Sequence, residues 1–194
     1  MSNPRAADAD LTAKARIRNA ALDLYAEHGE DRVSLRAVAA AAGVTLGLVQ
    51  HHFKTKSGLR DAVDQLVVDH FEHALREVPE TGGPRAHAAA RDAAVRRMLA
   101  KNPPVVNYLR RALLDPNPEQ LGLLDALVEL TRREVAMLRK AGLASTERAD
   151  GTQVLAVLVR QMGELFLQPL VDAVHTRITD SADAPKPTLT VRVD

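Results

Sequence analysis

The chain has 194 residues, of which 46% are hydrophobic, 26% charged and 3% aromatic. This composition excludes an intrinsically disordered protein and predicts a globular one whose core is built from aliphatic side chains, as suits packed helices. A net charge of +1 excludes a protein that coats nucleic acid through bulk charge alone.

The residue types and patterns that the sequence lacks also restrict where the protein is located and which chemistry it can perform. Cysteine is absent, which excludes disulfides, thiolate catalysis and cysteine metal sites. We find no apolar run near the roughly 20 residues that span a bilayer, and no signal-peptide core in the N-terminal MSNPRAADAD. We therefore expect a cytoplasmic protein that does not associate with membranes.

The chain starts with a polar tail and a first helix. Residues 1–10 are small and polar and predict disorder. A helical pattern runs from Leu11 to His28, and Gly29 stands where a glycine ends a helix.

Two short helices are predicted around Gly43. Ser34 and Thr45 are their candidate N-caps, because a hydroxyl there can accept a hydrogen bond from a free amide of the first turn. Gly43 most easily takes the left-handed conformation that ends the first of the two helices. Residues 34–56 therefore predict a helix-turn-helix, the arrangement that places its second helix in the DNA major groove.

The remainder predicts more helices and no sheet. A fourth helix is expected from Ser57, with Ser57 as its cap, to Val78. Further helices are expected at 85–101, 104–114, 118–141 and 146–179, and Pro169 should kink or break the last one. Residues 181–194 predict a disordered tail, and the fold class is all-α.

The predicted helix-turn-helix lies in the basic part of the chain. Residues 11–60 carry an excess of four positive charges. A recognition helix enters the groove by its N-terminal half, which places Thr45, Leu46, Gly47 and Leu48 nearest the bases, and Gln50 and His51 one turn on. Arg36 can reach guanine or a phosphate, and Lys56 a phosphate.

The stretch A-V-A-x-x-A-G-V-T-x-G-x-V-x-x-H-F-x-x-K-x-x-L, from Ala37 to Leu59, resembles the N-terminal signature of the TetR family of transcriptional regulators. The resemblance covers residues 11–72. It implies a homodimer whose N-terminal three-helix units bind a palindromic operator in double-stranded DNA. It also implies a C-terminal domain that binds a small-molecule effector and releases the DNA, usually ending repression.

The resemblance can be carried over position by position. It implies DNA contacts at Ser34, Arg36, Thr45, Leu46, Gly47, Leu48, His51, His52 and Lys56. Gln50 stands where the family usually has a phosphate-binding tyrosine, and Leu46 where a polar or basic residue is common. We therefore expect few direct base contacts and more reliance on phosphate anchoring and DNA shape.

The expected domains are a DNA-binding domain at 11–56, a connecting helix at 57–78, and an effector-binding and dimerisation domain at 79–180. Effector contacts are expected from polar residues within apolar helical stretches: Asn107, Tyr108, Gln153, Arg160, Gln161 and Glu164. Alternatively Arg160 and Glu164, four residues apart, form an ion pair. The methionines fit core packing better than a pocket lining: Met98, Met137 and Met162.

Dimerisation is predicted from the last helix. Residues 154–159, with Leu165, Phe166, Leu167, Leu170 and Val174, are apolar around most of a helix, which must then be buried on two sides. One side can face its own domain and the other a second subunit. The preceding helix can complete a four-helix interface through Leu121, Leu124, Leu127, Val128 and Leu138.

Metal binding, cofactors and catalysis are not predicted. His51 and His52 are adjacent and do not face each other on a helix, and His70 and His73 have no carboxylate at helical spacing that clearly completes a site. The sequence has no glycine-rich phosphate loop. The predicted function is a ligand-responsive homodimeric repressor. The alternative is a DNA-binding architectural or activator protein whose C-terminal helices only dimerise, which a filled core would favour over a buried pocket.

Overall fold

The computed structural model describes residues 12–114, 121–179, 185–191 and 193. Within these ranges the regular structure is helical, which confirms the all-α fold class. The chain divides into two compact units, Met1–Leu130 and Thr131–Asp194. The predicted disorder of residues 1–10 falls outside the described residues.

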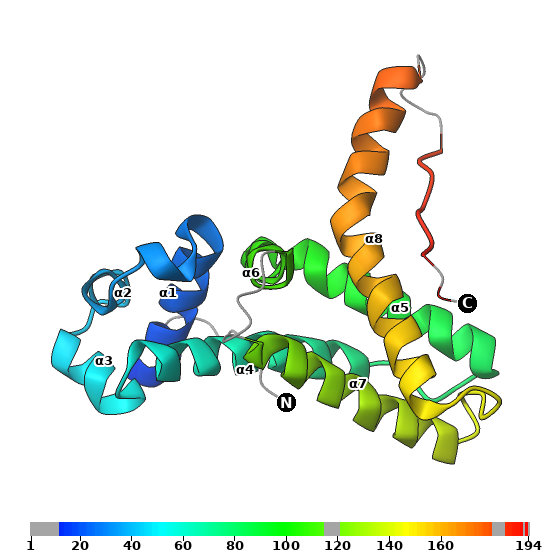
Figure 1. Cartoon of the computed structure of the whole chain (residues 1–194), viewed down its shortest axis with the longest axis horizontal. Helices are drawn as coiled ribbons and strands as arrows, with labels where there is room; N and C mark the ends of the chain where they lie inside the picture. Colours follow the sequence, from blue (N-terminus) through cyan, green and yellow to red (C-terminus); the bar gives the residue numbers. More distant parts are fainter. Residues whose placement is uncertain (1–11, 115–120, 180–184, 192, 194) are drawn as a thin grey trace. The chain divides into compact units, whose positions relative to one another are not determined.

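The first three α-helices of the N-terminal unit are α1 (Ala13–His28), α2 (Leu35–Ala41) and α3 (Leu46–Phe53), with a short 3₁₀ turn, η2 (Glu30–Arg32), before α2 (Figure 1). Gly29 ends α1 with a positive φ of 83°, as predicted. α1 packs against both α2 and α3. The shared core consists of aliphatic and aromatic side chains: Ile17, Ala21, Leu22, Tyr25, Val38, Val49 and Phe53.

Hydroxyl side chains cap the N-termini of four helices in this unit. In each case the hydroxyl oxygen accepts a hydrogen bond from the backbone N–H three residues further on. The predicted caps Ser34 and Thr45 accept at 3.1 and 3.2 Å. Each cap satisfies one of the amide donors that a helix leaves free at its start, and together they fix where the helices begin.

The start of α4 (Lys56–Arg76) differs from the prediction. Thr55, and not Ser57, caps the helix, accepting from the Gly58 N–H at 3.0 Å, and the Ser57 hydroxyl lies 2.9 Å from the Thr55 hydroxyl. A Cβ at Gly58 would lie 2.3 Å from the carbonyl oxygen of Phe53. Glycine thus permits the close junction between the end of α3 and the first turn of α4, and this junction brings Thr55 into the capping position.

The N-terminal unit also contains α5 (Pro84–Lys101), α6 (Pro103–Leu114) and the first part of α7 (Gly122–Lys140). α5 packs against α4, and α6 packs against α1. Because α6 returns to the first helix, this unit extends to Leu130, well past the functional boundary that we expected near residue 79.

The C-terminal unit contains the rest of α7 and the long helix α8 (Asp150–Ile178). α8 begins four residues later than predicted. The Arg139 guanidinium contacts three groups at the start of α8. It donates to the Gln153 side chain and to the Arg148 carbonyl, and it pairs with the Asp150 carboxylate. Pro169 was expected to kink or break this helix, and it does not break it, since α8 continues to Ile178. A proline removes only one amide donor from this long helix, and the remaining turns are retained.

Part of the predicted C-terminal disordered tail is ordered. Residues 185–191 run extended beside α8 (Figure 1). The Gln168 side chain donates to the Pro187 carbonyl at 2.9 Å and accepts from the Leu189 N–H at 2.7 Å. A Cβ at Gly163 would lie 2.6 Å from Val191, so this glycine leaves room for the segment.

The apolar character of α8 corrects one expectation. By length and composition, this helix could cross a membrane, although no sufficiently long apolar run was expected. Core helices of soluble proteins meet the same criterion, and α8 carries charged residues at Arg160, Glu164 and Asp172. The feature alone therefore does not indicate a membrane protein.

Candidate nucleic-acid interface

The turn between α2 and α3 has the predicted geometry. Gly43 has a φ of 63°, and the Val44 N–H donates to the Ala39 carbonyl at 3.0 Å. Val49 and Phe53 are buried beneath α3. Val33 and Val38, at the two ends of the staple around the start of α2, are buried as well. One face of α3 is thus fixed to the core, and the opposite face is free to meet a ligand.

The outward face of α3 contains most of the predicted base-reading residues. Thr45, Gly47, Gln50 and His51 are exposed. Leu46, Leu48 and His52 are half-buried. The His52 ring packs edge-on between the rings of its neighbours, with centroids 5.4 Å from His51 and 6.2 Å from Phe53. Of the two adjacent histidines, His51 is therefore the more accessible to DNA.

The predicted contacts from α2 are also on the surface. Ser34 is exposed, and although its oxygen caps α2, its O–H can still donate to a phosphate. Arg36 is exposed near the start of α2 and has no ion-pair partner within the part of the chain that the structure describes. Its guanidinium is available for a base edge or a phosphate.

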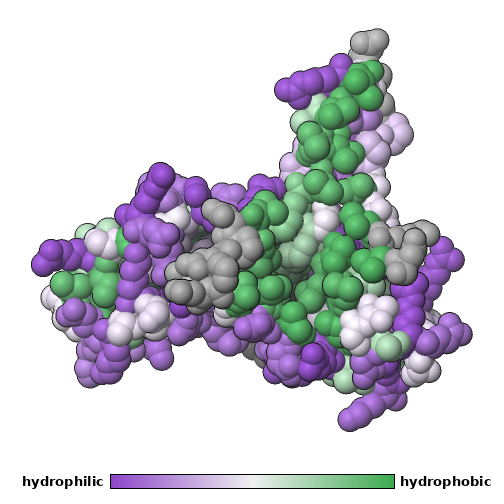
Figure 2. Space-filling model, viewed as in Figure 1, coloured by the Kyte–Doolittle hydropathy of each residue, from purple (hydrophilic) through white to green (hydrophobic). Residues whose placement is uncertain are grey.

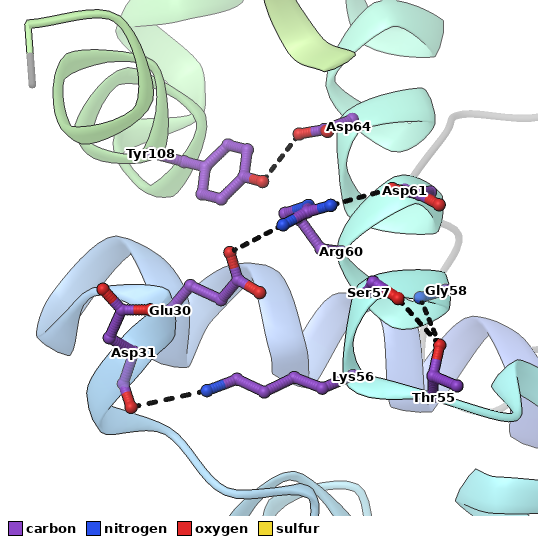
Figure 3. Close-up of polar contacts among 10 residues, drawn as sticks. All are labelled: Glu30, Asp31, Thr55, Lys56, Ser57, Gly58, Arg60, Asp61, Asp64 and Tyr108. Atoms are coloured by element: carbon purple, nitrogen blue, oxygen red, sulfur yellow. Dashed lines mark hydrogen bonds and ion pairs between the residues drawn. The ribbon is translucent and has the colours of Figure 1, made fainter. Parts of the chain in front are cut away.

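Lys56 is held in place at the start of α4. Its Nζ donates to the Asp31 carbonyl at 3.4 Å (Figure 3). On the next turn Arg60 pairs with Glu30 at 3.7 Å. Burial raises the pKa of Glu30, and the positive charges of Arg60 and Lys56 oppose this rise. The amine is thus placed beside the positive end of the α4 dipole, where a phosphate oxygen would be favoured.

Comparison with known proteins agrees with this geometry. Residues 17–63 match the family described as bacterial regulatory proteins, tetR family. This segment therefore resembles the TetR family, and the match covers about a quarter of the chain. The matched segment runs from within α1 into α4 and contains both helices of the helix-turn-helix.

Among curated proteins, the chain is similar to the HTH-type transcriptional regulatory protein RaaS of Mycobacterium tuberculosis (strain ATCC 25618 / H37Rv). The two are 46% identical over 76 residues, which is 39% of this chain. The match spans only 35% of the relative's length, about a third.

Solved structures resemble the fold over most of the chain. A transcriptional regulator from Rhodococcus sp. Rha1 is 24% identical with a TM-score of 0.65, covering 84% of this chain and 87% of that one. The multidrug binding protein EbrR, complexed with imidazole, is 23% identical with a TM-score of 0.60, covering 89% and 82%. At these identities the likeness shows a TetR-like fold alone.

Two contacts in the N-terminal unit join α6 to α4 and to the end of α1, and sequence reasoning missed both. The Tyr108 hydroxyl donates to Asp64 of α4 (Figure 3), and the Arg111 guanidinium donates to the Ala26 and Glu27 carbonyls at the end of α1, at 3.0 and 2.8 Å. The Tyr25 ring stacks near the Tyr108 ring, with centroids 6.5 Å apart.

The predicted effector residues do not form one cluster within either unit. On α6, Asn107 is exposed and Tyr108 is buried against Asp64. The other four lie on α8 in the C-terminal unit and are half-buried, and the Gln153 side chain is already bonded to Arg139: Gln153, Arg160, Gln161 and Glu164.

A cavity of about 370 Å³ lies between α4 and α5, and none of the six predicted effector residues lines it. His70, His73 and Met98 do line it, so the assignment of Met98 to core packing is wrong. Within the described ranges, no group of three or more histidines and carboxylates could hold a metal ion. No local sequence signal marks this cavity, because it depends on how α4 and α5 pack.

Proposed function

We propose that this protein is a regulator of the TetR type: a sequence-specific DNA-binding protein that acts as a homodimeric repressor and is released from a palindromic operator by a small-molecule effector. The helix-turn-helix carries the proposal. One face of α3 is anchored by Val49 and Phe53, and the opposite face is solvent-exposed from Thr45 to His51. A surface helix fixed in this way is suited to enter the major groove.

The proposed docking places the N-terminal half of α3 against the bases. Gly47 has no side chain, so the backbone of α3 can approach the base edges closely. Lys56 and the free amides at the start of α4 would bind one phosphate, and Arg36 a second or a base. Leu46 and Leu48 can read only apolar features such as a thymine methyl group, so shape readout should contribute strongly.

The proposed dimer is formed by α8. Six large apolar side chains of this helix are exposed, and they recur every three or four residues, or multiples of this spacing, along one face. Apolar surface follows the helix along its length (Figure 2). These residues are Leu155, Val159, Leu167, Leu170, Val174 and Ile178. A continuous exposed apolar stripe of this kind calls for a partner, and a second copy can cover it by two-fold symmetry.

The proposed release mechanism uses α4. This helix carries Lys56 at its start, and His70 and His73 of its later turns line the cavity. An effector that binds more tightly when α4 is shifted would increase the population of the shifted position. The shift would change the distance between the two recognition helices of the dimer. That spacing must match about one DNA turn, roughly 34 Å. The resemblance to EbrR, described as a multidrug binding protein, supports the effector-responsive form of the proposal.

The cavity also bears on the alternative, a DNA-binding architectural or activator protein whose C-terminal helices only dimerise. A filled interior would favour that alternative. The space between α4 and α5 favours a sensor.

Genomic footprinting of the full-length protein, followed by fluorescence anisotropy on the recovered sites, tests the proposal. We expect enrichment of a palindrome with half-sites one helical turn apart, and an affinity at least a thousandfold above that for unrelated DNA at equal salt. Equal affinity for both DNAs would refute sequence-specific binding.

A further inference from the structure

The cavity between α4 and α5 has a mixed lining, and one part of that lining is apolar. Ala74 and Ala94 are buried in its wall, and Met98 and Val78 add aliphatic surface. A volume of about 370 Å³ lies within the range of pockets that hold small organic molecules. The apolar part of the lining suits an aliphatic or other apolar body of an organic molecule.

The rim of the cavity carries uncompensated positive charge. Arg97 and Lys101 stand four residues apart on α5, so their side chains are neighbours on one helix face. Both are exposed, and neither has an ion-pair partner among the residues that the structure describes. Like charges at this spacing repel each other unless an anion lies between them.

The one acidic residue of the lining does not balance these two cations. The Glu77 carboxylate lies 3.2 Å from the imidazole of His73 on the same helix. The Asn102 side-chain amide donates to the Met98 carbonyl at 2.7 Å, which directs that NH₂ group away from a cavity ligand. Arg97 and Lys101 are thus the side chains best placed to receive a charged head group.

We propose that this cavity binds a small organic anion, with a carboxylate between Arg97 and Lys101 and an apolar body against Ala94 and Met98. Binding of the anion does not depend on the proposed function. Only the further statement that this anion is the effector rests on it. A bound carboxylate would relieve the repulsion between the two cations while its chain lies against the apolar part of the lining. Because α4 forms the opposite wall, the ligand would also contact the helix that starts at the DNA-binding unit.

The experiment compares three ligands with the same chain and different head groups. Octanoate, octan-1-ol and octylammonium are titrated into the full-length protein by isothermal titration calorimetry at pH 7.5. Octanoate is expected to bind about tenfold or more tightly than the other two, since a charge-assisted contact to two cations is available to the carboxylate alone. Equal binding of octanoate and octan-1-ol, or tighter binding of octylammonium, overturns the proposal.

Two variants locate the site. Arg97→Gln/Lys101→Gln is expected to remove the preference for octanoate, whereas Arg85→Gln/Lys140→Gln, which removes the same charges at exposed positions outside the cavity, should preserve it. Ala90→Phe places a ring at an exposed lining position and is expected to weaken all three ligands. Loss of the preference in the control variant and not in the cavity variant would overturn the assignment.

The effector role is measured separately, by anisotropy on an operator recovered by footprinting. Octanoate is expected to weaken operator binding of the wild-type protein about tenfold and to leave Arg97→Gln/Lys101→Gln unaffected. Anion-selective binding without any change in operator affinity would overturn the effector role. Failure of the ligand-free protein to distinguish operator from unrelated DNA would instead count against the proposed function, with the calorimetric result unchanged.

Discussion

The hydroxyl of Tyr108 on α6 donates a hydrogen bond to the carboxylate of Asp64 on α4, with 2.6 Å between Oη and Oδ1 (Figure 3). Both side chains are buried. Burial raises the pKa of Asp64 to about 6, even though the Tyr108 hydrogen bond and the Arg60 charge favour the ionised form. The contact thus joins two helices at the cost of burying a carboxylate in its charged form near neutral pH.

Asp64→Asn should change how stability depends on pH. Asparagine still accepts from Tyr108 but cannot ionise. Because the pKa of Asp64 is raised from about 4 when unfolded to about 6, the folded protein holds this proton more tightly between those values. The stabilisation from the protonated carboxyl is complete about one pH unit below 4 and is lost as the pH rises through 6. The free energy of unfolding of the wild type, relative to the variant, should fall by about 2 kcal/mol from pH 4 to pH 7.

Urea denaturation at a series of pH values measures this difference. Asp125→Asn, at an exposed position on α7, serves as the matched control. A difference between wild type and Asp64→Asn that stays constant with pH would contradict the assignment.

Arg111→Lys should loosen the connection between α6 and the end of α1. The Arg111 guanidinium bonds two adjacent carbonyls at 3.0 and 2.8 Å, and a lysine keeps the charge but not the planar fork. We expect the free energy of unfolding to fall by about 1–2 kcal/mol. Arg85→Lys, in the exposed first turn of α5, should change it by less than about 0.5 kcal/mol. Equal effects of the two substitutions in chemical denaturation would argue against the contact.

The helix-turn-helix could be predicted from sequence because its determinants are local. Ser34, Gly43 and Thr45 act within three or four residues of their own positions, and the structure places each as predicted. The cap of α4 was missed because Thr55 and Ser57 are both suitable hydroxyls. The choice between them depends on the close approach of Gly58 to the Phe53 carbonyl, which follows from packing.

The remaining features depend on residues far apart in sequence. Tyr108 and Asp64 are 44 residues apart, and no spacing rule links them. The polar, proline-containing C-terminus predicted disorder by composition, but Gln168 provides both a donor and an acceptor to its backbone. Composition alone cannot register such a partner.

Gly47→Ala separates DNA recognition from folding. A Cβ at this position would meet only the Thr45 hydroxyl, at 3.9 Å, so the fold can accept it. Alanine in place of a helical glycine should stabilise the protein by up to about 1 kcal/mol. If the backbone of α3 approaches the bases here, the added methyl should still weaken operator binding about tenfold in anisotropy titrations.

Two other glycines provide the controls. Gly151→Ala on α8 has nothing within 4 Å of the new Cβ, so it should give the same gain in stability and unchanged operator affinity. Gly58→Ala meets the Phe53 carbonyl at 2.3 Å and should destabilise the protein strongly. Unchanged operator affinity in Gly47→Ala would mean that the start of α3 does not approach the bases closely.

Lys56→Gln should weaken DNA binding independently of sequence. If its amine binds a phosphate, operator and unrelated DNA should both lose affinity, and the slope of log K against log salt should flatten by about one unit for each amine removed. Lys140→Gln, at the exposed end of α7, provides the same charge change away from the helix-turn-helix. Anisotropy between 50 and 300 mM salt measures both slopes, and equal slopes for Lys56→Gln and wild type would contradict the phosphate contact.

Leu170→Glu tests the proposed dimer without disturbing the core. The Leu170 side chain is 60% exposed, in the middle of the apolar stripe on α8, so a carboxylate there costs little in an isolated subunit. In a two-fold interface the two charges would be buried or brought close together, and this should convert a dimer into a monomer. Leu114→Glu is the matched control, since Leu114 is 63% exposed at the end of α6, outside the stripe. Light scattering coupled to size-exclusion chromatography should show a dimer for the wild type and Leu114→Glu and a monomer for Leu170→Glu. A Leu170→Glu variant that stays dimeric would require an interface other than this face of α8. A monomeric variant that also loses operator affinity would connect subunit pairing to the recognition of two half-sites.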